Sequence, residues 1–248
     1  MNTNKTWEQL RHLKLQGMAD RYAAIIDQPL HQQPEAHAMM AMLAEAEEEK
    51  RTIQRTQLYL KLAKLRYSAY VEQVNCKPER GLTSEQLIRL SDCSYIKKSE
   101  NILITGATGC GKSYLACALG RQACVKGYKV LYYPMNRFIE QLALAKLDGS
   151  YLKWLNRAAD RQIARVPLLI LDDFGLQPLS HDIKMALLQI LEDRYASGST
   201  IVTAQMPVGK WFEYLNQKSL GDAICDRLTA NAHRINLEGE SLRKAKNI

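Results

Sequence analysis

The stretch "GATGCGKS" at residues 106–113 has glycines at its first, fourth and sixth positions and ends in a lysine and a serine. Glycine permits backbone angles that other residues avoid, and it lets the chain approach a ligand closely. The backbone N–H groups of such a loop converge on phosphate, and the lysine and serine supply an ammonium and a hydroxyl. Apolar "NILIT" precedes the loop and helix-forming "YLACALG" follows it. This context indicates a nucleotide-phosphate site more than a chance match in a surface turn.

Within this loop, Lys112 is expected to reach the β- and γ-phosphates and Ser113 to bind Mg²⁺. The start of the following helix directs its positive end at the phosphates. The residues expected to contact the nucleotide are Gly106, Ala107, Thr108, Gly109, Cys110, Gly111, Lys112, Ser113 and Tyr114.

Two acids follow a second apolar stretch, "PLLIL", which is continuously apolar as a strand buried on both faces should be. Ligands of open α/β sheets gather at the carboxyl ends of the strands. We therefore expect Asp172 to lie on the Mg²⁺ side of the site and Asp173 to polarise the attacking water. The alternative is that the two acids only cap the loop after the strand.

A third apolar stretch, "STIVTAQ", ends with the polar Thr203 and Gln205. Gln205 is placed to touch a γ-phosphate or the attacking water. Arg227, in "AICDRL", is a candidate arginine finger that stabilises the charge of phosphoryl transfer. Judged by itself, Arg227 is more simply a surface arginine.

From about residue 100, short apolar stretches alternate with helical ones, which predicts an α/β fold with a parallel sheet of about five strands and helices on both faces. The expected strands are "NILIT", "KVLYY", "PLLILDD", "STIVTA" and "HRINL". Expected helices run from the loop through Lys126 and over about residues 181–196.

The first 76 residues read as a small all-helical domain, and residues 77–248 as the nucleotide-binding domain. Pro29 and Pro34 interrupt the helical pattern. Residues 35–77 contain no glycine or proline, so we expect one long helix or two nearly continuous ones there. We expect the helical domain to serve oligomerisation or contact with DNA or a partner.

The formal net charge is +8, which favours a polyanionic partner without identifying one. A basic run over residues 50–66 includes Lys61 and Lys64. A second set recurs every four residues, on one face of an expected helix. It consists of Lys153, Arg157, Arg161 and Arg165. Both sets are candidates for contacts with DNA phosphates and equally for solvated helix faces. Because neither set suggests a code for base edges, we expect sequence-tolerant binding.

The six cysteines form no C-x-x-C pair, and no cluster of histidines accompanies them. Cys110, Cys117 and Cys124 are seven apart, and we expect them to be buried, reduced thiols. No apolar stretch reaches the roughly 20 residues that a membrane helix needs. The amino-terminal stretch lacks a secretory pattern, so we expect a cytoplasmic protein.

Taken together, these stretches resemble the AAA+ class of P-loop ATPases, and within it the IstB-like transposition helper ATPases and the DnaC-type helicase loaders. The resemblance rests on "LRHLKLQGMADRY", "ENILITGATGCGKSYLACALG", "LLILDDFGLQPL", "TIVTAQMPVGKWFEYL", "DAICDRL" and "INLEGESLRK". It implies an ATP-driven homo-oligomer around DNA, with Arg227 completing the site of the neighbouring subunit and Gln205 in the sensor-one position.

The chain departs from general AAA+ modules in two respects. Only 21 residues follow Arg227, too few for the helical lid that carries a second sensor arginine. Arg243 is the candidate replacement for that arginine. Asp173 stands where many AAA+ proteins have glutamate, and its shorter side chain suggests slow hydrolysis.

The leading hypothesis is an ATPase that assembles on duplex DNA and assists a transposase. The alternative is a replicative helicase loader, which favours single strands and binds a helicase. A soluble kinase built on the same loop is a third possibility, but it requires an acceptor pocket and a phosphate-clamping lid that the sequence does not show.

Overall fold

The computed structural model describes residues 3–151, 153 and 163–242. The chain divides into two compact units, Met1–Leu58 and Tyr59–Ile248. Each unit is described by itself below. No helix in the described part of the chain is both long and apolar enough to cross a membrane.

The first unit is helical, as predicted, and contains α1 (Thr3–His12), α2 (Gln16–Ile26) and most of α3 (Ala36–Ala63). The proline-containing break holds only a short 3-10 turn, Leu30–Gln32. At Gly17 the backbone of α2 lies directly against α3, because a Cβ added there would be 2.3 Å from the carbonyl oxygen of Ala46. The carboxylate of Glu47 accepts the backbone N–H of Gly17 at 2.7 Å. This contact between the two helices requires glycine on one side and a buried acceptor on the other.

The long helix ends earlier than expected. Helix α3 stops at Ala63, and Lys64 takes a left-handed backbone with φ 52°. Up to Lys77 only the 3-10 turn Val71–Gln73 follows, so the prediction of continuous helix through residue 77 is wrong. The reason is tertiary packing: side chains from this segment, including Leu65 and Tyr67, pack on the core of the second unit and outweigh local helix propensity. Residues 59–76 lie in the second unit by this division.

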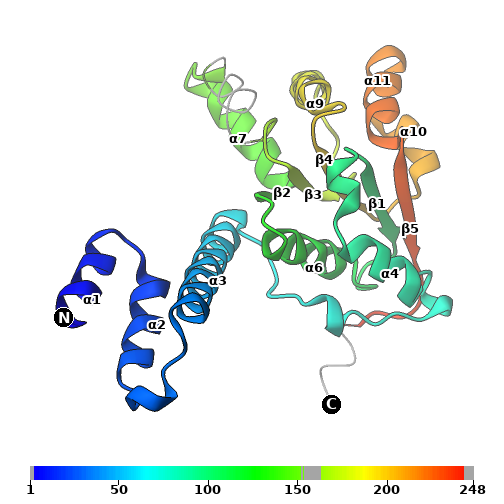
Figure 1. Ribbon diagram of the computed structural model, residues 1–248. Helices are drawn as coiled ribbons and strands as arrows, with labels where there is room; N and C mark the ends of the chain where they lie inside the picture. Colours follow the sequence, from blue (N-terminus) through cyan, green and yellow to red (C-terminus); the bar gives the residue numbers. More distant parts are fainter. Residues whose placement is uncertain (1–2, 152, 154–162, 243–248) are drawn as a thin grey trace. The chain divides into compact units, whose positions relative to one another are not determined.

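The second unit is built on a five-stranded sheet with the order β2-β3-β4-β1-β5 (Figure 1). All neighbouring strands are parallel, as predicted. The strands are β1 (Asn101–Gly106), β2 (Val130–Pro134), β3 (Leu168–Phe174), β4 (Ser199–Ala204) and β5 (Ala232–Leu237). Since β3, β4 and β1 are adjacent, their carboxyl ends bring the acids, Gln205 and the glycine-rich loop to one edge.

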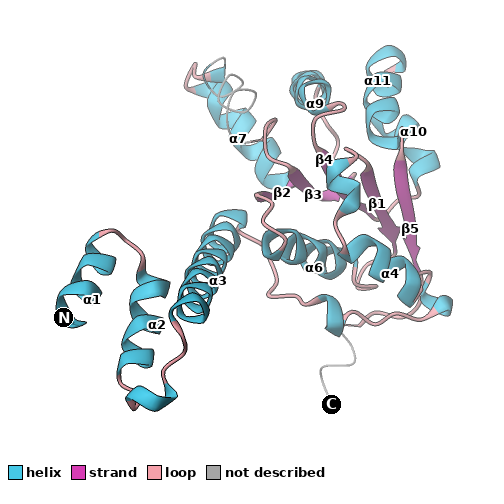
Figure 2. Ribbon diagram, in the orientation of Figure 1, coloured by secondary structure: helices cyan, strands magenta, loops and turns pink. Residues whose placement is uncertain are grey.

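Helices cover both faces of this sheet (Figure 2). Side chains of β1 alternate between two cores: Ile102 and Ile104 pack in one, and Leu103 packs in the other. The first core contains α4 (Ser84–Ser91), α5 (Ser94–Lys97) and α6 (Lys112–Val125). The second contains α7 (Met135–Leu147), α9 (His181–Arg194), α10 (Trp211–Leu215) and α11 (Lys218–Thr229). The three-layer α/β architecture is therefore confirmed, and no helical lid follows β5 within the described residues.

Arg194 is a buried residue whose structural role was not predicted from the sequence. It is only 2 % exposed and donates to the carbonyls that lead into β3 and β4. Its acceptors are the carbonyl oxygens of Ile163, Ala164, Val166 and Ser199 and the hydroxyl of Thr200. One side chain at the end of α9 thus fixes the entry of two central strands.

The cysteines follow the prediction. All six are free thiols, and Cys110, Cys117 and Cys124 are buried. Burial raises the pKa of Cys117 to about 11, because the thiolate is poorly solvated there.

Candidate nucleotide-binding site

The glycine-rich loop joins the end of β1 to the start of α6. Gly106, Gly109 and Gly111 all have positive φ, at 145°, 86° and 103°. A Cβ at Gly106 would lie 2.1 Å from the carbonyl oxygen of Leu237. The first glycine is therefore required by its backbone angle, as the sequence pattern predicts, and also by its close approach to β5, which the sequence pattern does not predict.

Lys112 is the first residue of α6 and is 6 % exposed. Its ammonium donates to the carbonyl oxygen of Ala107 at 2.8 Å, so it lies within the loop. A buried ammonium at the amino end of a 14-residue helix favours binding of an anion at this loop.

Ser113 reaches across to β3. Its Oγ donates to Asp172 Oδ1 at 2.8 Å. Asp172 is fully buried, and it also accepts hydrogen bonds from the hydroxyls of Tyr132 on β2 and Thr203 on β4. Three neutral hydroxyl donors from three elements hold this carboxylate in place.

Asp173 occupies an irregular point of β3. Its backbone is left-handed, with φ 62°, and the register between β3 and β4 shifts between Leu171 and Phe174. The N–H of Asp173 donates to Thr203 Oγ1 at 3.0 Å, so this threonine contacts both acids. A non-glycine residue in this conformation carries strain of about 1 kcal/mol or more, which is common at functional sites.

The surroundings of Asp173 raise its pKa above the ordinary value. Burial is the largest cause, and the charge of Asp172 acts in the same direction. The cations Arg66 and Lys112 act against this rise. The carboxylate is therefore shifted toward the range in which a carboxylate becomes a better proton acceptor.

Arg66 is a member of the site that the sequence analysis placed only in a basic run. Its Nη1 lies 3.3 Å from Asp173 Oδ2 and 3.7 Å from Asp172 Oδ2. The guanidinium also lies over the ring of Tyr67, 5.5 Å from its centre. No sequence pattern marks this residue, because the contact depends on how the chain returns to the sheet after α3.

Gln205 follows β4 and meets the loop. The hydroxyl of Thr108 donates to Gln205 Oε1 at 3.0 Å. The structure thus brings loop, acids and Gln205 to one edge, as the strand order requires.

Arg227 lies elsewhere in the same chain. Its carbonyl oxygen accepts from the side chain of Asn101, at the start of β1, whereas the glycine-rich loop follows the end of that strand. The guanidinium pairs with Glu192 at 2.9 Å and with Asp226 at 2.7 Å. Arg227 is therefore at the edge of the sheet opposite its own loop.

Tyr114 extends from α6 toward the segment after α3. Its hydroxyl donates to Gln73 Oε1 at 2.9 Å, and its ring lies 6.4 Å from that of Tyr67. On the other side of the loop, the N–H of Leu242 donates to the carbonyl oxygen of Gly109 at 3.0 Å. The chain after β5 thus contacts the loop, which the sequence analysis did not foresee.

The candidate DNA contacts are only partly described. Lys61, in α3, and Lys64 are exposed, and so is Lys153. Arg165 is exposed but lies in a bend that leads into β3, so the prediction that it continues a helical stripe is wrong. Arg157, Arg161 and Arg243 lie outside the described residues.

The oxygen donors at this edge suit a hard divalent ion. Ser113 supplies a hydroxyl and Asp172 a carboxylate, 2.8 Å apart. Within residues 3–151, 153 and 163–242 no cluster of three or more His, Cys, Asp or Glu side chains forms a metal cage. Mg²⁺ prefers such a sparse protein contribution, completed by waters and phosphate oxygens, so the residues fit this ion.

Comparison with known proteins agrees with the phosphate-binding loop predicted from the sequence. A family model described as "IstB-like ATP binding protein" matches residues 8–248. A relative in Sinorhizobium fredii, named as an insertion sequence ATP-binding protein, is 41 % identical over 244 residues, covering 98 % of each chain. A relative in Pseudomonas aeruginosa with a similar name is 27 % identical and covers 94 % of this chain and 86 % of its own.

Solved structures show the same fold at low sequence identity. The structure of DnaI aligns with a TM-score of 0.56 at 20 % identity, over 70 % of this chain and 90 % of DnaI. The DnaC helicase loader aligns with a TM-score of 0.54 at 19 % identity, over 71 % of this chain and all of the loader chain. The family match over almost the whole chain places this protein in the family of IstB-like ATP binding proteins, with the fold of AAA+ P-loop proteins.

Proposed function

We propose that this protein is an ATPase that binds ATP with Mg²⁺, assembles on duplex DNA as a homo-oligomer and assists a transposase. The observation that carries the proposal is the contact of Ser113, in the phosphate-binding loop, with the buried Asp172, beside Asp173. The relatives named as insertion sequence proteins support the transposition context.

In this proposal, backbone N–H groups over residues 106–114 and the ammonium of Lys112 hold the phosphates. Ser113 and Asp172 hold Mg²⁺, and the ion supplies neutralisation of phosphate charge when bound. Tyr132 and Thr203 keep Asp172 oriented, because both hydroxyls donate to its carboxylate.

Asp173 is the group that accepts a proton from the attacking water. Its raised pKa favours that role, and its bond to Thr203 keeps its backbone beside the ion site. Gln205 touches the γ-phosphate or that water, and its hydrogen bond with Thr108 of the loop supports this role. The shorter carboxylate of Asp173 implies slow turnover.

Assembly follows from the position of Arg227. Because it lies at the edge opposite its own loop, it serves as an arginine finger only in a neighbour's site. Within its own chain the guanidinium pairs with Glu192. The proposed oligomer thus makes hydrolysis depend on assembly.

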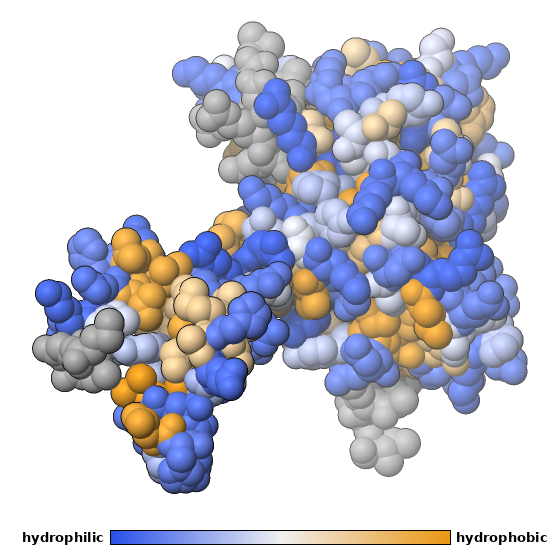
Figure 3. Space-filling view, viewed as in Figure 1, coloured by the Kyte–Doolittle hydropathy of each residue, from blue (hydrophilic) through white to orange (hydrophobic). Residues whose placement is uncertain are grey.

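The first unit is the proposed contact for oligomerisation or for the transposase. Several of its large apolar side chains are exposed, and hydrophobic residues are visible on it in Figure 3. These residues are Leu13, Leu30, Met40, Ile53 and Leu58. Exposed apolar surface of this kind marks protein interaction sites. In the same view, the second unit shows mostly hydrophilic residues with hydrophobic patches between them.

The test is co-sedimentation with duplex DNA, with and without ATP and Mg²⁺. We expect ATP-dependent sedimentation of protein with DNA, and the cognate transposase should raise ATP turnover. A protein that stays monomeric at every nucleotide and DNA concentration would contradict the proposal.

The helicase-loader alternative shares the fold of DnaC. It predicts a stable complex with a replicative helicase and preference for single strands. A pull-down that compares helicase with transposase separates the two. Family membership leaves the kinase possibility without support.

A further inference from the structure

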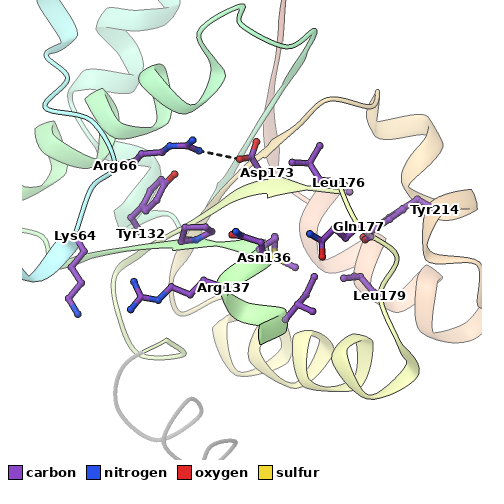
Figure 4. A pocket seen from close by; sticks show the side chains of 14 residues that line it. Lys64, Arg66, Tyr132, Asn136, Arg137, Asp173, Leu176, Gln177, Leu179 and Tyr214 are labelled. Carbon is purple, nitrogen blue, oxygen red and sulfur yellow. Dashed lines mark hydrogen bonds and ion pairs between the residues drawn. The ribbon is translucent and has the colours of Figure 1, made fainter. Parts of the chain in front are cut away.

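A cavity of about 460 Å³ lies beside Asp173, at the carboxyl ends of β2 and β3. Among the described residues that line it, three are cations and one is an acid. The cations are Lys64, Arg66 and Arg137, and the acid is Asp173. In Figure 4, Arg66 points at Asp173, whereas the charged ends of Lys64 and Arg137 extend to the same side of the view. The cavity is separate from the glycine-rich loop, but it shares Asp173 with the proposed ATP site.

The charge of this cavity is not balanced by its described surroundings. The only acid in its described lining, Asp173, is held by Arg66 at 3.3 Å. Among the described carboxylates, none lies within ion-pair distance of Lys64 or Arg137, so neither cation has an acidic partner there. Arg66 itself keeps 45 % of its side chain exposed and is accessible from the cavity. Unpaired cations around a concave space favour an anionic ligand.

The polar lining indicates which anion fits. Asn136 and Gln177 add side-chain amides, which donate hydrogen bonds through nitrogen. Guanidinium, ammonium and amide donors together suit a tetrahedral oxyanion that only accepts hydrogen bonds. A phosphodiester of a nucleic-acid backbone is such a group, and most protein–DNA hydrogen bonds go to phosphate and sugar.

We propose that this cavity is a second anion site, which takes a phosphodiester group of the DNA backbone through Lys64 and Arg137. The inference rests on the proposed function, since it assumes that the protein binds DNA. It adds the residues of the DNA contact.

The experiment measures DNA affinity by fluorescence anisotropy of a labelled duplex, with a non-hydrolysable ATP analogue and Mg²⁺. The test variant is Lys64→Ala with Arg137→Ala. The matched control is Lys97→Ala with Lys126→Ala, two exposed lysines that precede β1 and β2 and so lie at the opposite edge of the sheet. Thermal melting of each variant checks that it folds.

The test variant should bind the duplex at least ~10-fold more weakly, with a log–log salt dependence shallower by about two units, since each phosphate contact contributes roughly 0.9. The control should match the unmodified protein. Equal affinity and equal salt dependence of the test variant would overturn the cavity proposal while leaving the proposed function intact. Absence of duplex binding by the unmodified protein would overturn the proposed function itself.

Discussion

Ser113 Oγ lies 2.8 Å from Asp172 Oδ1, although 59 positions separate the two residues in the chain. The contact exists because β4 alone separates β1 from β3, so the loop after β1 and the acids near the carboxyl end of β3 meet at one edge. Thr203, at the end of that intervening strand, bonds to Asp172 and receives the N–H of Asp173. The ATP site that we propose is therefore a property of strand order.

Asp173→Asn should retain ATP binding and lose turnover by about 10²-fold or more, because general base catalysis contributes typically 10²–10⁴-fold. Calorimetry of ATP binding and a steady-state ATPase assay measure the two effects separately. Asp182→Asn is the control, since Asp182 pairs with Lys146 on the surface. Turnover by Asp173→Asn at the unmodified rate would remove this carboxylate from catalysis.

Arg227→Ala should bind ATP normally and lose the turnover that DNA stimulates, because its guanidinium completes a neighbour's site. Lys112→Ala should lose ATP binding. Mixed together, the two inactive variants should recover part of the activity, since one supplies an intact loop and the other an intact arginine.

Arg234→Ala, an exposed arginine on β5, serves as the control for Arg227→Ala. If the mixture stays as inactive as its components while each still assembles on DNA, Arg227 does not act across subunits.

Glu47 should make the stability of α2 depend on pH. Burial would raise its pKa, but hydrogen bonds from Arg51 and from the N–H groups of Met18 and Gly17 outweigh burial, and the net pKa is lowered. A lowered acid pKa contributes stability above the unfolded-state value near 4.5, and that stability is lost as pH falls through the folded-state pKa.

Glu47→Gln should therefore lower the free energy of local unfolding of α2 by about 2 kcal/mol at pH 7, with a smaller difference near pH 3. Hydrogen exchange of the α2 amides in the intact chain measures this. Glu48→Gln, at an exposed neighbour, is the control. A loss of the same size at both pH values would show that charge on Glu47 is not the cause.

Arg194→Met should lower the free energy of unfolding by about 3 kcal/mol or more, because it leaves several buried carbonyl oxygens without donors. Denaturant unfolding measures this loss, with Arg89→Met as the exposed control on α4. Equal effects of the two substitutions would mean that the hydrogen bonds of the buried guanidinium do not stabilise the starts of β3 and β4.

The five strands and the loop could be predicted because their signals are local. Buried parallel strands carry continuous apolar runs, and the loop joins its glycines, Lys112 and Ser113 within eight residues. The alternation of strands and helices predicts a parallel sheet, but it does not predict the order of the strands in that sheet. The side-by-side placement of β1, β4 and β3 needed the structure.

What the sequence did not predict depends on contacts between distant segments. Helix α3 ends at Ala63 because the residues after it pack into the hydrophobic core of the second unit, to which they belong, and no local propensity encodes this packing. Arg66 reaches the acids across 107 positions, and Arg194 binds carbonyls about 30 positions away. A single arginine in a basic run gives no sign of such a role.

The most direct test is calorimetric titration of ATP into the intact protein with and without Mg²⁺, repeated on Ser113→Ala and Asp172→Asn. We predict that ATP binds, that Mg²⁺ tightens the binding, and that both substitutions remove most of this gain while the fold persists. Absence of ATP binding would contradict a nucleotide site formed by these two elements. So would a gain in affinity from Mg²⁺ that is as large in both variants as in the unmodified protein.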